Sequence, residues 1–381
     1  MGEPRTGAKV LMLESGGWGG IHQYAHALAN ALADTGIEVV LLTAERYELH
    51  DRPCRFRRLQ VLRRENYLVT LVRIARILQR ERPAVVHLQS LISQRKDLLL
   101  LLLFRLWGAR LVMTVHNLLP HEVRWGERRL YLLYYRLVDA TILHSERNRR
   151  DLLALEPRLN PARVHRIPHG NYAYFRDLEL SRQEARARLG LAPTGRLALF
   201  LGAIRPYKGL DLFLRMVRPV RAACPEVRFA AAGMVLRGDQ TEYDRQITEL
   251  GLGPEELSTR FSYLTHAESV AYVCAADLVV LPYRAIYQSG ILLFAFTFGR
   301  PVVATRVGSF PETVEDGRSG WLVEPEDLEG MVSTLIRVFR APTELEAAGE
   351  YARGQAERQY GWPGIAARTA QVYAEVSPCP R

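Results

Sequence analysis

Short apolar runs alternate with stretches of helical periodicity along most of the chain. In the first half the runs predict strands at Lys9–Leu13, Glu38–Thr43, Ala84–Leu88, Arg110–Val115, Asp139–Leu143 and Val164–Ile167. Between them, apolar positions recur at helical spacing over Ile21–Ala33, Tyr67–Gln79, Lys96–Trp107, Arg128–Leu137 and Glu146–Leu155. Continuous apolar runs are typical of strands buried on both faces, and their alternation with helices predicts a parallel sheet with right-handed crossovers.

The same alternation restarts after a polar stretch, Arg176 to Arg188, that is rich in Arg and Glu. The second half predicts strands at Leu197–Gly202, Val227–Ala232, Phe261–Leu264, Leu278–Pro282 and Pro301–Thr305, and helices at Asp211–Ala222, Tyr243–Leu250, Glu268–Ala275 and Ile291–Phe298. A chain of 381 residues is also long enough for two domains. We therefore expect two Rossmann-like α/β domains, over residues 1–175 and 176–360, and a segment 361–381 that packs back on the first.

Ligands of such sheets bind at the carboxyl ends of the strands. With two domains of this type facing each other, we expect the active site in the cleft between them.

Composition and charge narrow the class of protein. With 48% hydrophobic and 24% charged residues the chain is typical of soluble globular proteins, and no apolar run reaches the roughly 18 residues of a membrane span. The four cysteines form no C-x-x-C pair, so we expect a reducing, cytoplasmic location. Residues 1–175 hold 27 Arg and Lys against 16 Asp and Glu, whereas the remainder holds 24 against 25. The basic first half favours an anionic partner, whether membrane lipid, nucleic acid or an acidic substrate.

A glycine-rich loop, Gly16 to Gly20, follows the first predicted strand and opens a helix. Its glycines allow the backbone to approach a ligand, and the helix N-terminus favours negative charge. The loop matches neither the dinucleotide fingerprint nor the Walker loop. A tight strand-to-helix turn would need only one or two of its four glycines.

Arg205 and Lys208 lie between a predicted strand end at Gly202 and a predicted helix start. Two cations three residues apart can converge on one phosphate beside the positive end of a helix. Lys208 is one of only three lysines among the 51 basic residues, so general composition does not explain it. An ordinary loop with two solvated cations is the alternative, and in either case we expect an exposed lysine.

Several motifs occur in order along nearly the whole chain: Gly16–Gly20, Thr114–Asn117, Ile167–Gly170, Gly202–Gly209, Leu281–Tyr283, Gln288–Gly290, Gly299–Thr305, Gly308–Glu312 and Trp362–Ala366. They resemble the motifs of the family-four retaining glycosyltransferases. Each motif is weak alone, but together they are specific. The resemblance implies the GT-B fold, two facing Rossmann-like domains. It also implies transfer of a sugar, with retention, from a nucleotide diphosphate sugar to a hydroxyl acceptor.

The resemblance further implies a role for each matching residue on the donor side. Arg205 and Lys208 would neutralise the donor diphosphate and stabilise the leaving nucleoside diphosphate without a metal ion. Ser289 and Gly290, at a helix start, would donate backbone hydrogen bonds to the same phosphates. The donor would be a UDP- or GDP-linked sugar, and no tightly bound cofactor is expected.

Residues of the first half are implied on the sugar side. Gly19 and Gly20 would approach the donor, and His116, at a strand end, would lie beside the transferred sugar. His121 and His169 are weaker candidates. His116 as a polar strand-end residue satisfied by its neighbours is the structural alternative.

One departure from the family pattern affects donor recognition. The family usually has two glutamates eight residues apart around the donor-binding helix start, the second of which contacts the ribose. Ile286 and Phe294 stand at those positions here. Neither can accept a hydrogen bond from a ribose hydroxyl, so the phosphate site is retained while ribose recognition must differ.

Other functions remain open on the sequence alone. A dehydrogenase would pair the glycine loop with an acidic residue such as Glu38, but it would leave Arg205 and Lys208 without a purpose. A non-catalytic partner subunit of a transferase is a second alternative, and an enzyme with a soluble small-molecule acceptor is a third. Nucleic-acid binding is not expected, because no recognition module accompanies the basic half.

A segment after His116 suggests where the enzyme works. Residues 121–136 mix four arginines with four aromatics, and Arg124, Trp125, Arg128 and Arg129 stand near its start. This composition suits a helix in a lipid interface, with cations at anionic headgroups. We therefore expect peripheral binding to the inner face of a membrane and a lipid-linked acceptor, with an amphipathic helix packed on its own sheet as the alternative.

Overall fold

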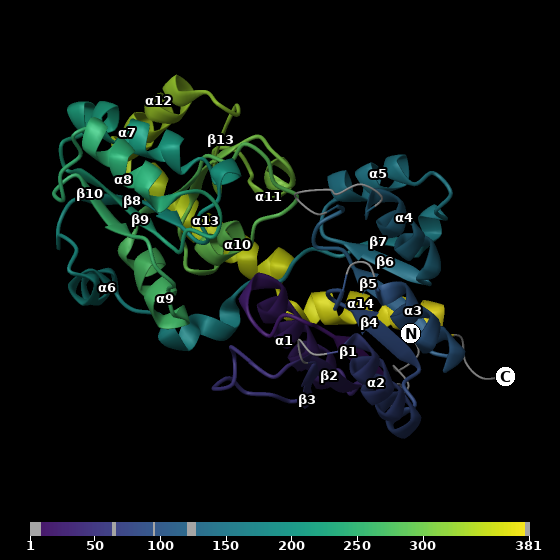
Figure 1. Ribbon diagram of the computed structural model, residues 1–381. Coiled ribbons are helices and arrows are strands. Elements are labelled where there is room, and N and C mark those ends of the chain that lie inside the picture. Colours follow the sequence, from purple (N-terminus) through teal and green to yellow (C-terminus); the bar gives the residue numbers. More distant parts are fainter. Residues whose placement is uncertain (1–8, 63–65, 94–95, 120–126, 378–381) are drawn as a thin grey trace. The chain divides into compact units, whose positions relative to one another are not determined.

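The computed structural model describes residues 9–62, 66–93, 96–119 and 127–377 (Figure 1). Contacts divide the chain into two compact units, Met1–Gly170 with Tyr360–Arg381, and Asn171–Gln359. Each unit holds one sheet, and the strands that pair within these sheets run parallel. The predicted α/β class with two Rossmann-like domains is thus confirmed.

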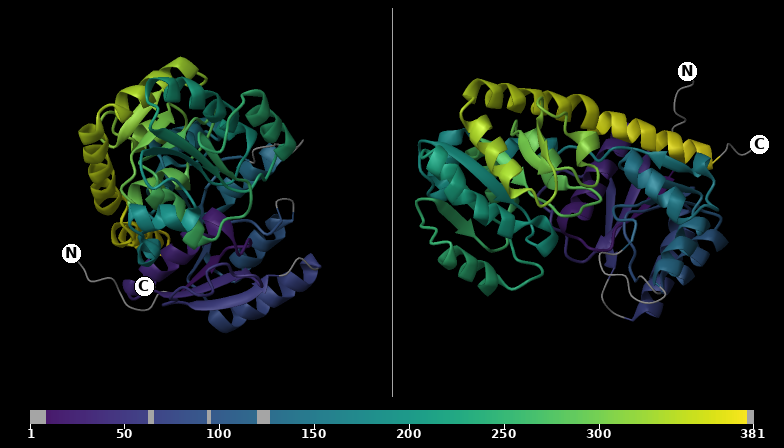
Figure 2. Two further views of the ribbon diagram at one scale, coloured as in Figure 1. Left: turned by 90° about the vertical axis from the view of Figure 1, so that its left-hand side faces the viewer. Right: turned by 90° about the horizontal axis from the view of Figure 1, so that it is seen from above.

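The first unit has a seven-stranded sheet in the order β3-β2-β1-β4-β5-β6-β7. Its strands are β1 (Lys9–Leu13), β2 (Glu38–Ala44), β3 (Arg57–Leu62), β4 (Val85–Leu88), β5 (Arg110–Thr114), β6 (Ala140–Leu143) and β7 (Val164–Arg166). Its helices are α1 (Gly19–Asp34), α2 (Tyr67–Glu81), α3 (Asp97–Leu106), α4 (Glu127–Leu137), α5 (Glu146–Leu155) and α14 (Trp362–Val376), with the 3-10 turn η1 (Pro161–Arg163). Because crossovers are right-handed, this strand order puts α2 to α5 on one face and α1 on the other. There α14 packs against α1 (Figure 2).

The second unit has a six-stranded sheet in the order β10-β9-β8-β11-β12-β13. Its strands are β8 (Arg196–Leu201), β9 (Val227–Ala232), β10 (Leu257–Arg260), β11 (Leu278–Leu281), β12 (Val302–Thr305) and β13 (Gly320–Val323). Its helices are α6 (Arg182–Leu189), α7 (Leu210–Ala223), α8 (Gln240–Glu249), α9 (His266–Ala275), α10 (Gly290–Thr297), α11 (Phe310–Thr313), α12 (Leu328–Phe339) and α13 (Pro342–Tyr360), with 3-10 turns η2 (Ala173–Leu178) and η3 (Pro206–Lys208).

The sequence pattern fails at the edges of the sheets. It misses β3 and β13, and its strand at Phe261–Leu264 is wrong, because the strand is β10, which ends at Arg260. Strand β13 is mostly buried, so exposure does not explain why the pattern misses it. Most residues of β3 and β10, by contrast, are partly or fully exposed. A strand at a sheet edge, half open to water, carries polar residues and shows no continuous apolar run.

The polar stretch between the two predicted domains contains a helix that the pattern also missed. Helix α6 begins at a capping box in which Ser181 and Glu184 exchange hydrogen bonds, and it ends at Gly190 with φ +63°. It packs on α9 within the second unit. The Arg/Glu-rich stretch is therefore partly an element of the second unit and not a plain linker.

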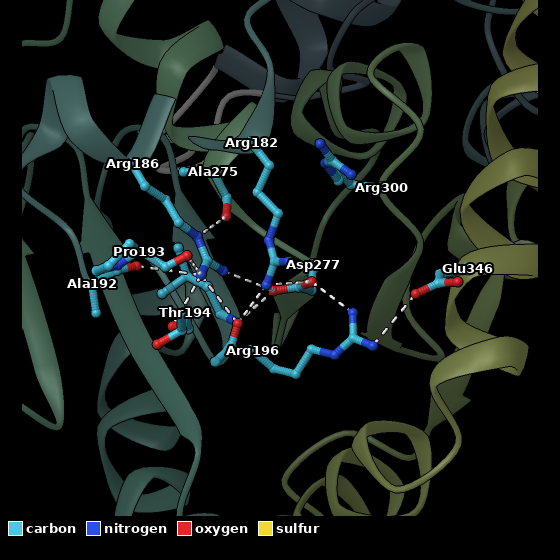
Figure 3. Close-up of polar contacts among 12 residues, drawn as sticks. Arg182, Arg186, Ala192, Pro193, Thr194, Arg196, Ala275, Asp277, Arg300 and Glu346 are labelled. Atoms are coloured by element: carbon cyan, nitrogen blue, oxygen red, sulfur yellow. Dashed lines mark hydrogen bonds and ion pairs between the residues drawn. The ribbon is translucent and has the colours of Figure 1, made fainter. Parts of the chain in front are cut away.

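Buried arginines hold α6, α9 and the sheet together (Figure 3). The Arg186 guanidinium is 2% exposed, donates to the carbonyl oxygens of Ala275 and of residues 192–195, and pairs with Asp277 at 3.0 Å. Arg300 donates to the carbonyls of Val273 and Cys274. Three of the last carbonyl groups of α9 thus receive a guanidinium donor, which is a favourable placement of positive charge at a helix C-terminus.

Candidate active site

In the second unit the turn after β8 carries Arg205 and Lys208. Gly209, which precedes α7, has φ +69°, and a Cβ atom there would lie 2.1 Å from the Pro282 carbonyl oxygen. Only glycine fits, so the chain turns tightly from η3 into α7. The side chain of Lys208 is carried at this turn, at the carboxyl end of β8.

Lys208 is buried, contrary to the expected exposed lysine. Its residue is 8% exposed, and its Nζ lies 5.4 Å from the centre of the Tyr283 ring. The Nζ also lies 3.4 Å from the position that a Cβ on Gly202 would take. Burial, followed by the charge of Arg205, lowers the pKa of Lys208 to about 8. Among the residues that the structure describes, no carboxylate forms an ion pair with Lys208 or Arg205.

Arg284, which directly follows Tyr283, braces this turn. Its backbone N–H donates to the Tyr207 carbonyl at 2.7 Å, and Nη1 donates to the Pro206 carbonyl at 3.0 Å. Both Nη atoms bind the Asp211 carboxylate, at 2.8 and 2.6 Å. A bidentate pair of this kind fixes geometry as well as charge. No motif in the sequence singles out Arg284, although it adjoins the motif Leu281–Tyr283.

Ser289 and Gly290 lie at the start of α10, as the resemblance implied. Ser289 is buried and makes no side-chain capping bond, so the first-turn N–H groups of α10 donate no hydrogen bond to its hydroxyl oxygen. A Cβ on Gly290 would lie 2.3 Å from the Tyr172 hydroxyl oxygen, which accounts for the glycine.

Phe294 and Ile286 stand at the positions where the family usually has glutamates, and neither brings a polar side chain to its position. Phe294 is 5% exposed and packs edge-on against Tyr172, with ring centres 5.3 Å apart, and against Phe298 at 5.1 Å. Ile286 is half-buried, and its carbonyl oxygen blocks any side chain at Gly308. The usual ribose-binding position is therefore part of an aromatic cluster.

In the first unit the glycine loop is held by two carboxylates. Glu14, after β1, accepts from the N–H groups of Gly16 at 2.6 Å and Gly17 at 3.0 Å. Burial alone would raise the pKa of Glu14, but its contact with His22, at 2.9 Å, and these N–H groups lower it. Glu48 accepts from the Gly19 N–H at 2.8 Å. The N–H groups of Gly16, Gly17 and Gly19 already donate to carboxylates. The loop is therefore better suited to let a ligand approach its backbone than to bind a phosphate through these N–H groups.

Gly19 and Gly20 border open space. A Cβ at either position would meet no atom within 4 Å, whereas one at Gly17 would lie 1.9 Å from the Arg46 carbonyl oxygen. Gly17 is thus required by the turn itself, and Gly19 also has φ +76°. The space beside Gly19 and Gly20 admits a ligand close to the backbone.

Three histidines follow three adjacent parallel strands of this unit. His116 comes after β5, His144 directly after β6, and His169 after β7, so all three lie at the carboxyl edge of the sheet. Each ring lies about 5 Å from the Tyr24 ring, centre to centre, at 5.1, 5.0 and 4.9 Å respectively. No motif in the sequence singles out His144, although its place at a strand end matches that of His116.

A hydrogen bond to the backbone fixes the proton of His144. His144 Nδ1 donates to the Ile167 carbonyl at 2.9 Å, so its Nε2 is free to accept from His116 Nδ1 at 3.4 Å. Burial and the neighbouring histidines lower the pKa of His116 well below 6.5, and burial lowers that of His144 to about 3. His116 is therefore neutral and carries a single ring proton, which either Nδ1 donates to His144 Nε2 at 3.4 Å or Nε2 donates to the Gln89 side-chain oxygen Oε1 at 3.2 Å. A half-buried neutral imidazole of this kind can form a hydrogen bond with a hydroxyl group.

The motif around His169 has a packing reason. His169 Nδ1 donates to the Gly170 carbonyl at 2.7 Å, and its ring is buried. A Cβ on Gly170 would lie 2.3 Å from the Trp362 indole. The motifs at Ile167–Gly170 and Trp362–Ala366 therefore meet, and the C-terminal segment packs on the first unit.

Only part of the predicted interfacial segment, residues 121–136, lies within the described residues. His121, Arg124 and Trp125 lie outside the described residues. Arg128 and Arg129, in α4, are exposed. Tyr134 and Tyr135 of the same helix are buried in the core, at 0% and 2% exposure, so these two aromatics do not flank a lipid-facing stripe.

Similarity to known proteins decides the family. A family model described as Glycosyltransferase Family 4 matches residues 18–171, and one described as Glycosyl transferases group 1 matches residues 195–341. The GDP-mannose:glycolipid 4-beta-D-mannosyltransferase of Xanthomonas campestris pv. campestris is 30% identical over 293 residues, which cover 75% of this chain and 74% of that protein. The chain belongs to glycosyltransferase family 4.

Other relatives of this glycosyltransferase agree with the assignment. D-inositol 3-phosphate glycosyltransferase 2 of Catenulispora acidiphila is 31% identical over 245 residues, 62% of this chain and 56% of that protein. The structure of Anabaena HepE in complex with UDP-glucose superposes with a TM-score of 0.78 at 17% identity, covering 96% of this chain and 99% of that one. The latter similarity shows the GT-B fold. The enzyme is thus a glycosyltransferase that uses a nucleotide-sugar donor.

One structural property bears on the membrane prediction. Within the described ranges, no helix of the transferase combines the length and the apolar composition needed to cross a bilayer.

Proposed function

We propose that this glycosyltransferase moves a hexosyl group from a UDP- or GDP-linked sugar to a hydroxyl of a lipid-linked acceptor, with Lys208 and Arg205 stabilising the leaving diphosphate. The observation that carries the proposal is a buried lysine without a carboxylate partner among the described residues, beside a second cation at a strand end. Burial of an unpaired charge costs free energy, and charges buried in this way are concentrated at functional sites.

The residue roles follow from where charge develops. As the bond between the sugar C1 and the phosphate oxygen breaks, negative charge grows on the diphosphate, and two fixed cations stabilise it most at that point. The N–H groups at Ser289 and Gly290 would add donors at a helix N-terminus. Arg284 is a positioning residue, because it binds the turn and not the substrate.

Residues of the first unit serve the transferred sugar in this proposal. The imidazole of His116 would form a hydrogen bond with a sugar hydroxyl, and Gly19 and Gly20 would let the donor approach the backbone. His169 would support the cluster through Tyr24, and His121 is retained as a weaker candidate. Ribose recognition must come from residues outside positions 286 and 294.

The acceptor is inferred from charge and relatives. The basic first half and exposed Arg128 and Arg129 suit an anionic membrane surface, and one relative is named for a glycolipid substrate. Other relatives are named for D-inositol 3-phosphate, which makes a soluble acceptor the second candidate. The enzyme would act at the cytoplasmic face of the membrane.

The test is a panel of nucleotide sugars. Thermal shift would first rank UDP- and GDP-linked donors, and radiolabelled transfer from the best donor would then be measured to a lipid extract and to inositol phosphates. Transfer to lipid is the expected result. Binding without hydrolysis or transfer would instead favour the non-catalytic subunit.

The pKa of Lys208 predicts that donor binding weakens as the pH becomes alkaline. A lysine with a pKa of about 8 is charged below that pH and neutral above it, and an anionic diphosphate binds the charged form. The Kd for the nucleoside diphosphate, measured calorimetrically, should therefore rise as pH increases through about 8, approaching tenfold per pH unit. Lys208→Gln should flatten the profile. A wild-type Kd that stays constant up to about pH 9.5 would contradict the assignment.

Metal removal gives a further test. Because two fixed cations can stand where other enzymes place a divalent ion, transfer should persist at full rate in excess EDTA. Loss of activity in EDTA that Mg²⁺ or Mn²⁺ restores would overturn the proposed role of the cation pair.

A further inference from the structure

Helices α2 and α3 carry most of the exposed apolar side chains of the described protein. Of nine large hydrophobic residues that are substantially exposed, seven belong to this pair of helices or directly follow it. Helix α2 contributes Leu68, Val69 and Val72. Helix α3 contributes Leu99, Leu102 and Leu106, and Trp107 follows it. These seven side chains define the α2–α3 face.

The two helices are neighbours on one face of the first sheet (Figure 1). The Tyr67 hydroxyl of α2 donates to Asp97 of α3 at 2.8 Å, which fixes their spacing. Leu99, Leu102 and Leu106 recur at helical spacing and form a stripe, in which Leu106 is 83% exposed. The sequence signal for this face is the unbroken run of six leucines in α3, which puts leucine on every side of the helix, including the side that meets water.

The charges of the α2–α3 face have one sign. Both helices are described completely, and their two carboxylates, Glu81 and Asp97, are buried, at 6% and 0% exposure. The cations Arg76, Arg80 and Lys96 are exposed in or beside the same helices. Within the described residues, the exposed charges of these two helices are thus cations, and apolar side chains bordered by cations are typical of a surface that lies in a lipid headgroup region.

We propose that the α2–α3 face docks the enzyme on an anionic lipid bilayer, with the leucines and Trp107 inserted at the boundary of the headgroups. The proposal rests on the membrane-borne acceptor of the proposed function and assigns the contact to α2 and α3, with Arg128 and Arg129 of α4 as added cations. A protein partner is less favoured, because protein interfaces draw their strength from Tyr, Trp and Arg, with Leu under-represented. The face here consists mostly of leucine and valine.

The test compares two double variants that add the same charge. Leu102→Glu with Leu106→Glu places two carboxylates, four residues apart, on the α2–α3 face, where both side chains are exposed and glutamate keeps the helix. Ala367→Glu with Gln371→Glu does the same at two exposed positions of α14, on the opposite face of the same sheet. Each full-length protein is sedimented with vesicles of phosphatidylcholine alone or with phosphatidylglycerol added, and its mass is measured by light scattering.

The wild type and the α14 variant should bind the phosphatidylglycerol vesicles with similar affinity and pure phosphatidylcholine at least about tenfold more weakly. The α2–α3 variant should lose about tenfold or more in affinity for the anionic vesicles. Equal vesicle binding by both variants would overturn the proposal. The proposal would also be overturned if the wild type did not bind the vesicles, was a dimer by light scattering, and became a monomer in the α2–α3 variant.

Hydrolysis of the donor in solution separates this inference from the proposed function. The α2–α3 variant should hydrolyse the nucleotide sugar at the wild-type rate, since neither leucine belongs to the donor site. Vesicle binding with no hydrolysis or transfer by any form of the protein would refute the proposed function and leave the docking surface standing.

Discussion

Replacing Lys208 by methionine is expected to lower the rate of sugar transfer about 100- to 1,000-fold while leaving the protein as stable as the wild type or more so. The loss corresponds to about 2.7–4 kcal/mol of transition-state stabilisation, the effect of removing one preorganised donor. Methionine has a similar length and can fill the space over Gly202 and beside Tyr283 without a charge.

The stability half of this prediction follows from burial. Burial lowers the pKa of Lys208 from 10.5 to about 8, so folding disfavours the charged form. At pH below 8 this amounts to a penalty of about 3 kcal/mol, which methionine does not incur. Because the unfolded state binds more protons between about pH 8 and 10.5, the wild type should gain stability relative to Lys208→Met as pH rises through that window.

Two measurements decide the outcome. The rate of transfer is compared among the wild type, Lys208→Met and Arg215→Met, a control that removes an exposed cation from α7, the helix that follows the same turn. The difference in Tm between the wild type and Lys208→Met is followed from neutral to alkaline pH. A Lys208→Met protein that transfers sugar normally would remove the residue from the mechanism, and a marked loss of Tm would show that the lysine stabilises the fold.

The central elements of both units could be predicted from the sequence because their strands are buried on both faces. Runs such as Val39–Leu42 and Leu278–Leu281 contain no polar residue, so the pattern has one interpretation. The edge strands β3 and β10 could not be predicted in the same way, since one side of each meets water. Helix α6 was missed because its two buried residues are a small alanine, Ala185, and an arginine, Arg186, and arginine is a residue that a sequence pattern assigns to the surface.

The sequence predicts those parts of the candidate site that neighbouring residues in the chain indicate, but not the parts that depend on contacts between distant segments. Arg205 and Lys208 were identifiable from their place between a strand and a helix and from the scarcity of lysine. The burial of Lys208 was not, because it depends on Tyr283, which is distant in sequence and reaches the turn through β11. The histidine cluster likewise arises from the order of β5, β6 and β7 in the sheet, which a single sequence does not reveal.

Substitution of Asp277 by alanine is expected to destabilise the second unit by about 3–5 kcal/mol, the cost of leaving buried charge without its partner. Asp277 is 9% exposed and pairs with Arg182 at 3.2 Å, Arg186 at 3.0 Å and Arg196 at 3.1 Å (Figure 3). Its Oδ2 also accepts from the Leu197 N–H at 2.7 Å, so the carboxylate ties the start of β8 to the start of β11.

Without the carboxylate, three guanidinium groups would face one another, and Arg186 is too deeply buried to reach water. The Tm of Asp277→Ala should therefore fall by roughly 10 °C, whereas Asp244→Ala, which removes an exposed carboxylate from α8, should change it little. Asp277→Asn keeps the shape and an acceptor oxygen for the Leu197 N–H but loses the charge, so its Tm should lie between the two. If Asp277→Ala unfolds at the temperature of Asp244→Ala, the arginine cluster does not hold α6 and the sheet together. If Asp277→Asn is as unstable as Asp277→Ala, the charge of Asp277 and not its hydrogen bond to Leu197 accounts for the stabilisation.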